Sequence, residues 1–317
     1  MTRQAVCPAR PVVPMPPAAL DLEFVRARPA MPGAFDALRL ILVGCGGTGS
    51  WLAPAVARIA RQFARQNGEV EVLFVDPDHV EEINTFRQNF CAAEVGHNKA
   101  ETLARRFGAA WGLAIGAVAA PFALELSENV SSRTLAVLIG CVDNAAARQS
   151  LHAALQRWRE HDDHTTWPGR LWWLDCGNAQ VGGQVLLGST LSPQRLGKAF
   201  SLSDRCSALP APSLQHPELL IPRPEELDPT ITGLSCEELA ARNAQSLTIN
   251  QMVAAVAADY LVGLVLAQNL KTYASYFDLQ SKSLRSKYIT PEALAPYALD
   301  EPPAKRTRPR ARRRQPA

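Results

Sequence analysis

The stretch 38-LRLILVGCGGTGSW-51 decides the fold of this 317-residue chain. Its first part, 38–44, is a continuous apolar run that ends in glycine and is typical of a strand buried on both faces. Gly44, Gly46 and Gly49 follow in the spacing G-x-G-x-x-G, and residues 51–66 have the pattern of a helix. Glycine lets a backbone approach phosphates, and a helix N-terminus attracts them. The stretch therefore predicts a nucleotide-binding α/β unit.

The same alternation continues along the chain. Strand-like runs occupy residues 69–76, 134–144, 170–178 and 181–188, and helix-like segments occupy 97–110, 145–158 and 246–270. Strands that alternate with helices indicate βαβ crossovers, hence an α/β fold with a mainly parallel sheet and helices on both faces. Residues 271–300 are expected to add a short strand or an irregular segment.

Three stretches depart from this pattern. Residues 1–35 are rich in Pro, Ala and Arg, and we expect an irregular N-terminal arm. Seven prolines interrupt the segment that begins at 189, which predicts a long crossover loop over about 189–244. Residues 301–317 carry seven Lys and Arg side chains that repel one another, so this tail is predicted to be disordered. The domain proper is then 36–300.

Composition narrows the class of protein. The net charge of +3 comes from the basic tail, which is the one part of the chain expected to contact nucleic acid. Seven cysteines occur without any CxxC pair, so neither a disulfide framework nor a zinc site is expected. The N-terminus lacks a signal-peptide core, and the longest apolar stretch, 252–267, is interrupted by Asp259. These features predict a cytoplasmic protein without a membrane anchor.

Polar residues after the second strand distinguish ATP from a nicotinamide or flavin cofactor. Asp76 ends that strand, where a carboxylate accepts hydrogen bonds from ribose hydroxyls. Sixteen residues just beyond it hold a polar cluster: Asn84, Arg87, Gln88 and Lys99. Arg and Lys offset charge that develops on the α-phosphate and on the leaving pyrophosphate. Hydride transfer gives such a cluster no role.

Asp143 is the candidate metal ligand. It follows the third strand, in CVDN, and the carboxyl ends of parallel strands face the ligand crevice of such folds. Mg²⁺ prefers few protein carboxylates together with phosphates and water. We therefore expect Asp143 to hold Mg²⁺ beside ATP.

Five motifs resemble those of one superfamily in content and in order. They are GCGGTGS (44–50), VDPDHV (75–80), NTFRQ (84–88), GHNKAE (96–101) and CVDN (141–144). Together they resemble the ThiF/MoeB/E1 superfamily of ATP-dependent adenylating enzymes, and most of all the ThiF-related proteins of PRTRC cassettes. The likeness covers about 38–188 and, more weakly, 245–270. It implies that the nucleotide is bound by the glycine loop, including Gly47 and Thr48, and by the polar residues named above.

The resemblance also implies a reaction and its partners. The implied enzyme is E1-like: it adenylates the C-terminal carboxylate of a ubiquitin-like protein ending in Gly, works as a homodimer and passes the product to an E2-like protein. Relatives use an arginine from the N-terminal region, for which Arg26 and Arg28 are candidates. Bacterial sulfur-carrier activators of this superfamily carry two CxxC pairs for zinc, which this chain lacks.

A thioester step would need a cysteine in or after the crossover loop. Cys236 precedes a helix-like segment whose N-terminus would lower the thiol pKa, and Cys206 is the alternative. Cys45 and Cys141 lie at strand ends, where burial is expected.

Three other interpretations remain open at this stage. They are an NAD- or FAD-dependent oxidoreductase, a non-catalytic protein that binds nucleotide and a partner, and an adenylating enzyme acting on a small molecule or peptide.

Overall fold

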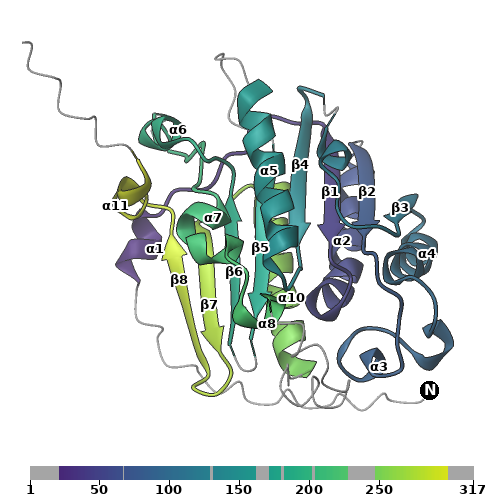
Figure 1. Cartoon of the computed structure of the whole chain (residues 1–317). Coiled ribbons are helices and arrows are strands. Elements are labelled where there is room, and N and C mark those ends of the chain that lie inside the picture. The colour runs from purple at the N-terminus through teal and green to yellow at the C-terminus, as the bar shows by residue number, and fades with distance from the viewer. Residues whose placement is uncertain are drawn as a thin grey trace, which may run out of the picture.

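The computed structural model describes residues 21–66, 68–128, 131–161, 171–179, 182–201, 204–227 and 247–298. Its strands form one sheet in the order β3-β2-β1-β4-β5-β6-β7-β8 (Figure 1). The parallel strands are β1 (Ala37–Val43), β2 (Glu69–Val75), β3 (Ile115–Val118), β4 (Thr134–Gly140) and β5 (Leu171–Asn178). The antiparallel strands are β6 (Gly182–Gly188), β7 (Thr272–Asp278) and β8 (Ser283–Tyr288). The predicted α/β class and mainly parallel sheet are confirmed.

Helices cover both faces of the sheet, as predicted. One face packs against α2 (Gly47–Arg65), α4 (Lys99–Trp111) and α10 (Leu247–Leu261), and the other against α5 (Ala145–His161) and α7 (Pro212–Gln215) (Figure 1). In β1, Leu40 and Leu42 belong to the first core, and Ile41 and Val43 to the second. This alternation of fully buried side chains explains the continuous apolar run in the sequence.

The strand order reverses between β1 and β4. β1 pairs with β2 on one side and with β4 on the other, although β4 follows it by about 90 residues. Such a reversal leaves a crevice at the carboxyl ends of the two strands, and open α/β sheets bind ligands there. Here the crevice receives the glycine loop after β1 and residues 141–144 after β4.

The crossover segment contains more regular structure than predicted. Four short helices occur in it: α6 (Pro193–Gly197), α7, η3 (Pro217–Leu220) and α8 (Pro224–Leu227). Each begins with proline, because the first helical position needs no backbone N–H and has the φ that proline already fixes. The prolines therefore start helices rather than exclude them. Residues 228–246, including Cys236, lie outside the described part of the chain.

Residues 21–35 of the predicted irregular arm begin beside the antiparallel edge of the sheet and end at α2, where Phe35 stacks on Phe63. They form α1 (Leu22–Arg26) and then an extended segment in which Ala30 bridges to Cys206 and is fully buried. The backbone N–H of Arg28 donates to the carbonyl of Ile289, and its guanidinium lies 5.8 Å from the ring centre of Phe200. This half of the arm is therefore packed onto the domain.

The segment after the crossover is a core helix followed by a hairpin. The helical stretch Leu247–Leu266, formed by α10 and the π-turn η5 (Val262–Leu266), is long and apolar enough to cross a membrane by length and composition. It packs against α2, β5 and β6, with 56% of its most apolar window buried. β7 and β8 then form the hairpin, where one strand or an irregular segment was predicted. The remaining short elements are α3 (Asn84–Arg87), η1 (Ala92–Glu94), η2 (Leu124–Ser127), α11 (Pro291–Leu294) and η6 (Ala295–Tyr297).

Candidate functional site

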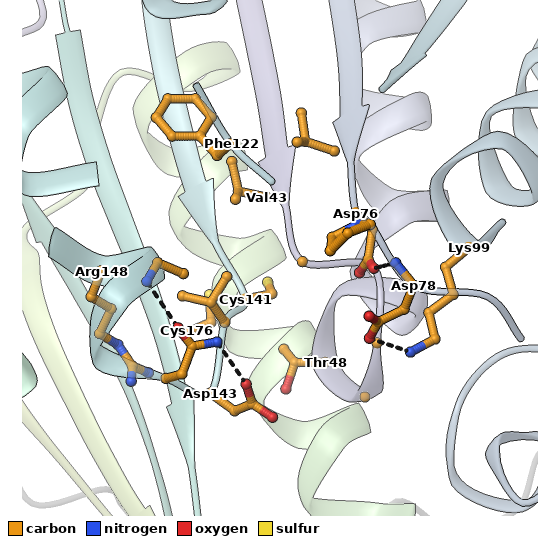
Figure 2. Close-up of a pocket in the computed structure, with 18 of the residues that line it drawn as sticks. Val43, Thr48, Asp76, Asp78, Lys99, Phe122, Cys141, Asp143, Arg148 and Cys176 are labelled. Atoms are coloured by element: carbon orange, nitrogen blue, oxygen red, sulfur yellow. Dashed lines mark hydrogen bonds and ion pairs between the residues drawn. The ribbon is translucent and has the colours of Figure 1, made fainter. Parts of the chain in front are cut away.

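A cavity of about 540 Å³ occupies the crevice at the carboxyl ends of β1, β2, β4 and β5. Figure 2 shows side chains from all sides of it: Asp76 and Lys99 on one side, Asp143 and Arg148 on the other, and Thr48 between them. The lining combines the glycine loop with charged and amide side chains. Most of the residues predicted from the motifs meet here: Gly44, Gly46, Gly47, Thr48, Asp76, Arg87, Gln88, Lys99 and Asp143.

The glycine loop is shaped by close backbone contacts. Gly44 has φ +87°, and a Cβ there would lie 2.6 Å from the carbonyl oxygen of Cys141. A Cβ on Gly49 would lie 1.9 Å from the carbonyl oxygen of Gly44, so only glycine fits. At Gly46, by contrast, the nearest atom to a Cβ is Gln88 Nε2 at 3.8 Å, an ordinary contact. The fold itself therefore does not require glycine at 46, and the space beside it is open for a phosphate.

Asp76 is fixed by the backbone around it. Its Oδ2 accepts from the N–H of Cys45 at 2.5 Å, and its Oδ1 accepts from the N–H of Asp78 at 2.8 Å. Burial raises the pKa of the Asp76 carboxyl, and the two backbone donors work in the opposite direction. Asp76 thus holds the start of the glycine loop while it lines the cavity where ribose binding was predicted.

Of the four polar residues predicted after β2, three line the cavity and one supports the neighbouring backbone. Lys99 is 7% exposed, and its Nζ lies 3.0 Å from Asp78 Oδ2 (Figure 2). Gln88 lines the cavity, and its Oε1 is buried with no hydrogen-bond partner among the described residues. Asn84 does not line the cavity: its Oδ1 accepts from the N–H of Glu81 at 3.0 Å. A role for Asn84 in binding phosphate stays a prediction, and its visible role is to hold the turn before α3.

Asp143 is an exposed carboxylate of the cavity, as is Asp78, which is paired with Lys99. Asn144, the neighbour of Asp143, precedes α5, and the Asn144 side chain accepts from the N–H of Ala147 in that helix at 2.9 Å. Across the described residues, no three His, Cys, Asp or Glu side chains are grouped to hold a metal ion. A divalent ion would therefore depend on Asp143, phosphate oxygens and water, which is the ligand set that suits Mg²⁺.

A buried ion pair supports the same side of the cavity. Arg148 on α5 is 8% exposed, and its Nε lies 3.1 Å from Oδ1 of the fully buried Asp175 on β5. Burial raises the pKa of the Asp175 carboxyl, and the Arg148 guanidinium opposes this effect. Arg148 was not among the residues predicted from the motifs. Its position five residues after Asp143, in the first turns of α5 that face the sheet, could have indicated a place near the site.

An amide network joins the glycine loop to the part of the chain beyond the crossover. Asn178 Nδ2 donates to Thr48 Oγ1 at 3.0 Å and to Asn250 Oδ1 at 2.5 Å. Asn250 on α10 is fully buried, and a Cβ on Gly47 would lie 2.7 Å from its Oδ1. The last strand of the parallel part, the glycine loop and α10 are thus held together at one point.

The crossover segment approaches the mouth of the cavity. Arg223 also lines it and donates through Nη2 to the backbone oxygen of Asp143. Glu226 accepts from Arg223 Nε at 3.0 Å through Oε1 and from the N–H of Ala145 at 2.8 Å through Oε2. Arg223 is 80 residues from Asp143 in the sequence, so no local pattern could have predicted this contact.

A second cavity of about 510 Å³ adjoins the first along β5, β6 and β7. Its walls include Leu219, Ile221 and Phe277 together with three glycines of β5 and β6. The larger part of this lining is apolar or glycine backbone, in contrast with the charged nucleotide crevice.

The cysteines differ in accessibility. Cys206 is fully buried and donates through Sγ to the carbonyl of Ala208, and burial raises its pKa to about 12. This argues against Cys206 as a nucleophile. Cys45 is buried as expected, and Cys141 is half-buried, with a hydrogen bond to Cys176 and burial raising its pKa well above the usual range. The predicted nucleophile Cys236 lies outside the described residues.

The helix α1, which ends at Arg26, lies beside β8 at the antiparallel edge of the sheet (Figure 1). Arg28 follows it and donates its backbone N–H to Ile289, and neither arginine lines the nucleotide cavity of its own chain. The N-terminal arginine that the resemblance implies is therefore not supplied within the chain by either residue in this structure.

No curated protein sequence matches the chain. Among solved structures, PaaA is similar with a TM-score of 0.45 and 17% identity over 79% of this chain and 64% of its own. Escherichia coli MccB solved with ATP is similar with a TM-score of 0.48 and 15% identity over 79% of this chain and 63% of its own. The chain thus spans less than two thirds of the length of either of these two structures.

The family comparison is more extensive. The model of the ThiF family matches residues 33–294, which include all the strands and helices that form the two cavities. The chain therefore belongs to the ThiF family.

Proposed function

We propose that this protein is an E1-like enzyme that uses Mg-ATP to adenylate the C-terminal carboxylate of a protein. The observation that carries the proposal is the cavity at the strand reversal. It combines a glycine loop left open at Gly46, the cations Arg87 and Lys99, and the exposed carboxylate Asp143 around one space. Hydride transfer by an oxidoreductase does not need this combination of residues, whereas cleavage of ATP between the α- and β-phosphates requires cations and a metal-binding carboxylate around the phosphates.

The residues would act by positioning and by charge. Asp76 would orient the ribose, and Gly46 with the N-terminus of α2 would receive phosphate oxygens. Arg87 and Lys99 would offset charge on the phosphates, while Asp143 would hold a Mg²⁺ ion that supplies further positive charge beside them. A carboxylate oxygen of the substrate would bond to the α-phosphorus as the bond to the bridging oxygen breaks, and pyrophosphate would leave with that electron pair. The products are an acyl-adenylate and pyrophosphate.

The second cavity supports a polypeptide substrate. It leads from the nucleotide site along the antiparallel strands and passes under α8 and η3 of the crossover. A chain end with small residues would fit a passage walled partly by glycine backbone. We assign this passage to the tail of a ubiquitin-like protein ending in Gly, and we further propose a homodimer, an E2-like acceptor and a cytoplasmic location. Transfer through Cys236 would extend the reaction to a thioester.

The test is pyrophosphate release from Mg-ATP in the presence of a ubiquitin-like protein encoded beside this one. Release that depends on that protein and disappears in Asp143→Asn would support adenylation. A reducible mass adduct that is absent in Cys236→Ser would support the thioester. If the protein binds ATP but releases no pyrophosphate with ubiquitin-like proteins, peptides or small carboxylates, the remaining interpretation is a non-catalytic protein that binds nucleotide and a partner. The absence of ATP binding would disprove the proposal.

A further inference from the structure

The two cavities meet at a junction formed by three side chains. Arg148, Asn178 and Arg223 line both the nucleotide cavity and the second cavity. Two of the three are arginines, and they come from segments distant in sequence: Arg148 from α5 and Arg223 from the crossover segment. The second cavity also has two acids in its lining, Glu218 and Glu226. The two guanidiniums therefore lie where a ligand in the second cavity would meet the nucleotide, and the charges of this lining balance.

Arg148 is the fixed member of the pair. Its Nε is held by Asp175, as described above, and its side chain is almost entirely buried. Its Nη2 lies 3.6 Å from the position that a Cβ of Gly177 would occupy, so the planar end of the guanidinium lies against the glycine backbone of β5. A buried arginine presented in this way suits a planar carboxylate, because the guanidinium offers several donors in one plane.

Arg223 is the exposed member, and the crossover segment orients it. Its Nε pairs with Glu226, which in turn accepts from the first N–H of α5. Its Nη2 donates to the backbone of Asp143, the residue proposed to hold Mg²⁺. Glu226 is thus engaged by Arg223 and by the helix, and Glu218 is paired with His216 at 2.7 Å. Arg148 and Arg223 are each paired with an acid through Nε, so what they offer a ligand at the junction is directed N–H donors of the guanidinium rather than a net positive charge.

We propose that Arg148 and Arg223 bind the terminal carboxylate of the substrate and orient one of its oxygens toward the α-phosphate. This inference rests on the proposed adenylation. It assigns the binding of the substrate carboxylate to two arginines of the same chain, whereas Arg26 and Arg28 lie away from the nucleotide cavity. The carboxylate would enter through the second cavity, with its last residues against the glycine backbone, and would bind between the two guanidiniums. The pair is then the element that distinguishes a free carboxylate from a blocked chain end.

The experiment compares two probes that differ only at this group: the peptide acetyl-Leu-Gly-Gly with a free carboxylate and the same peptide as its C-terminal amide. Each is titrated, by NMR, into the full chain saturated with α,β-methylene ATP and Mg²⁺. We expect the wild type to bind the carboxylate at least ~10-fold more tightly, which corresponds to about 1.4 kcal/mol. Arg223→Gln is expected to reduce this ratio to below about threefold, because an exposed guanidinium is removed without disturbing the core.

Arg148 needs a compensated variant. Arg148→Gln alone would leave Asp175 as an unpaired buried charge, which is destabilising. The double variant Arg148→Gln/Asp175→Asn removes both charges together, and it is also expected to lose the preference for the carboxylate. Arg205→Gln is the matched control: it changes an arginine on the same crossover segment that lines neither cavity and lies 3.8 Å from Asp204.

The outcomes separate this inference from the function on which it rests. Equal affinity of the wild type for the two peptides, including no detectable binding of either, would overturn the inference. So would a ratio that stays unchanged in both variants. If the wild type releases pyrophosphate and the rates of both variants are within about twofold of the wild-type rate, the role given to the arginine pair is wrong and the proposed adenylation is retained. If the ratio behaves as expected but no carboxylate leads to release, the pair binds carboxylates and the adenylation is wrong.

Discussion

The parallel and antiparallel halves of the sheet contribute different kinds of wall to the two cavities. In the parallel half, charged side chains are fixed by nearby partners: both Asp76 oxygens accept backbone N–H groups, and Lys99 is paired with Asp78. In the antiparallel half, most of the cavity wall is apolar or glycine backbone, and apart from Arg148 its charged side chains come from the crossover segment. The first half is thus prearranged for a nucleotide, whereas the second depends on a segment that is distant in sequence.

The largest expected effect tests the charge of the parallel half. Asp143→Asn keeps the size of an exposed side chain but removes its negative charge. If Asp143 holds Mg²⁺, pyrophosphate release should fall ~10²–10³-fold, as when one electrostatic stabiliser of a transition state is removed. The thermal midpoint should stay unchanged, and so should ATP affinity measured without Mg²⁺. Asp204→Asn, on the exposed surface of the crossover segment, is the control. Equal loss in both variants would contradict the assignment.

The second prediction separates packing from binding within the glycine loop. Gly49→Ala forces a Cβ against the carbonyl of Gly44, so the loop must shift, and the free energy of unfolding should fall by about 3 kcal/mol. Gly46→Ala meets an ordinary contact and should change that free energy by less than about 0.5 kcal/mol. Its methyl group nevertheless enters the space assigned to phosphate, so ATP affinity measured by calorimetry should fall about 10-fold. Unchanged ATP affinity in a stable Gly46→Ala would place the phosphates elsewhere.

The two halves also differed in how far their sequence predicted them. The apolar runs of β1, β4 and β5 were recognisable because almost every residue in these strands is buried. In β2 and β6 only the second half of the strand is buried, and the β-branched and aliphatic residues there indicated a strand. β3 was missed because it is a four-residue edge strand containing glycine, and β8 because its sequence, SLRSKY, is polar on an exposed edge. The helices of the crossover were missed because their starting prolines resemble breakers.

The site shows the same division. Asp76 and Asp143 follow strand ends, so sequence order alone brings them to one edge of the sheet, and Lys99 begins the helix α4 that lies beside them. Arg223 reaches that edge only through the path of the crossover, and Arg148 only through its pairing with Asp175. Such contacts depend on tertiary structure rather than on a local motif.

The third prediction concerns the amide network that joins the halves. Asn250→Ala removes the acceptor of Asn178 and leaves buried polar groups near Thr48 without a partner. The free energy of unfolding should fall by about 1–3 kcal/mol, measured by urea denaturation. ATP affinity should weaken a few-fold, because the glycine loop loses its support from α10. Asn269→Ala, an exposed amide beyond η5, should have an effect below about 0.5 kcal/mol. Equal costs would mean that the network does not stabilise the junction of the halves.

The smallest expected effect concerns the contact between α5 and the crossover helix α7. His152 Nδ1 lies 2.8 Å from Ser213 Oγ, and burial lowers the pKa of the ring below its usual 6.5. The neutral ring is favoured in the folded protein, so the unfolded chain takes up the proton first as the pH falls. Stability should therefore decrease as the pH drops from about 6.5 through the lower pKa of the folded state.

His152→Gln should remove this part of the pH dependence, a difference of less than about 1 kcal/mol between pH 7.5 and pH 5.5 in urea denaturation. His97→Gln, an exposed histidine next to α4, should leave the dependence as in the wild type. If His152→Gln also reduces the preference for the peptide carboxylate at low pH, the contact of α7 with α5 helps to hold Arg223 at the junction. If it changes stability alone, the crossover is held there by Glu226 and the start of α5, and the two halves meet independently of α7.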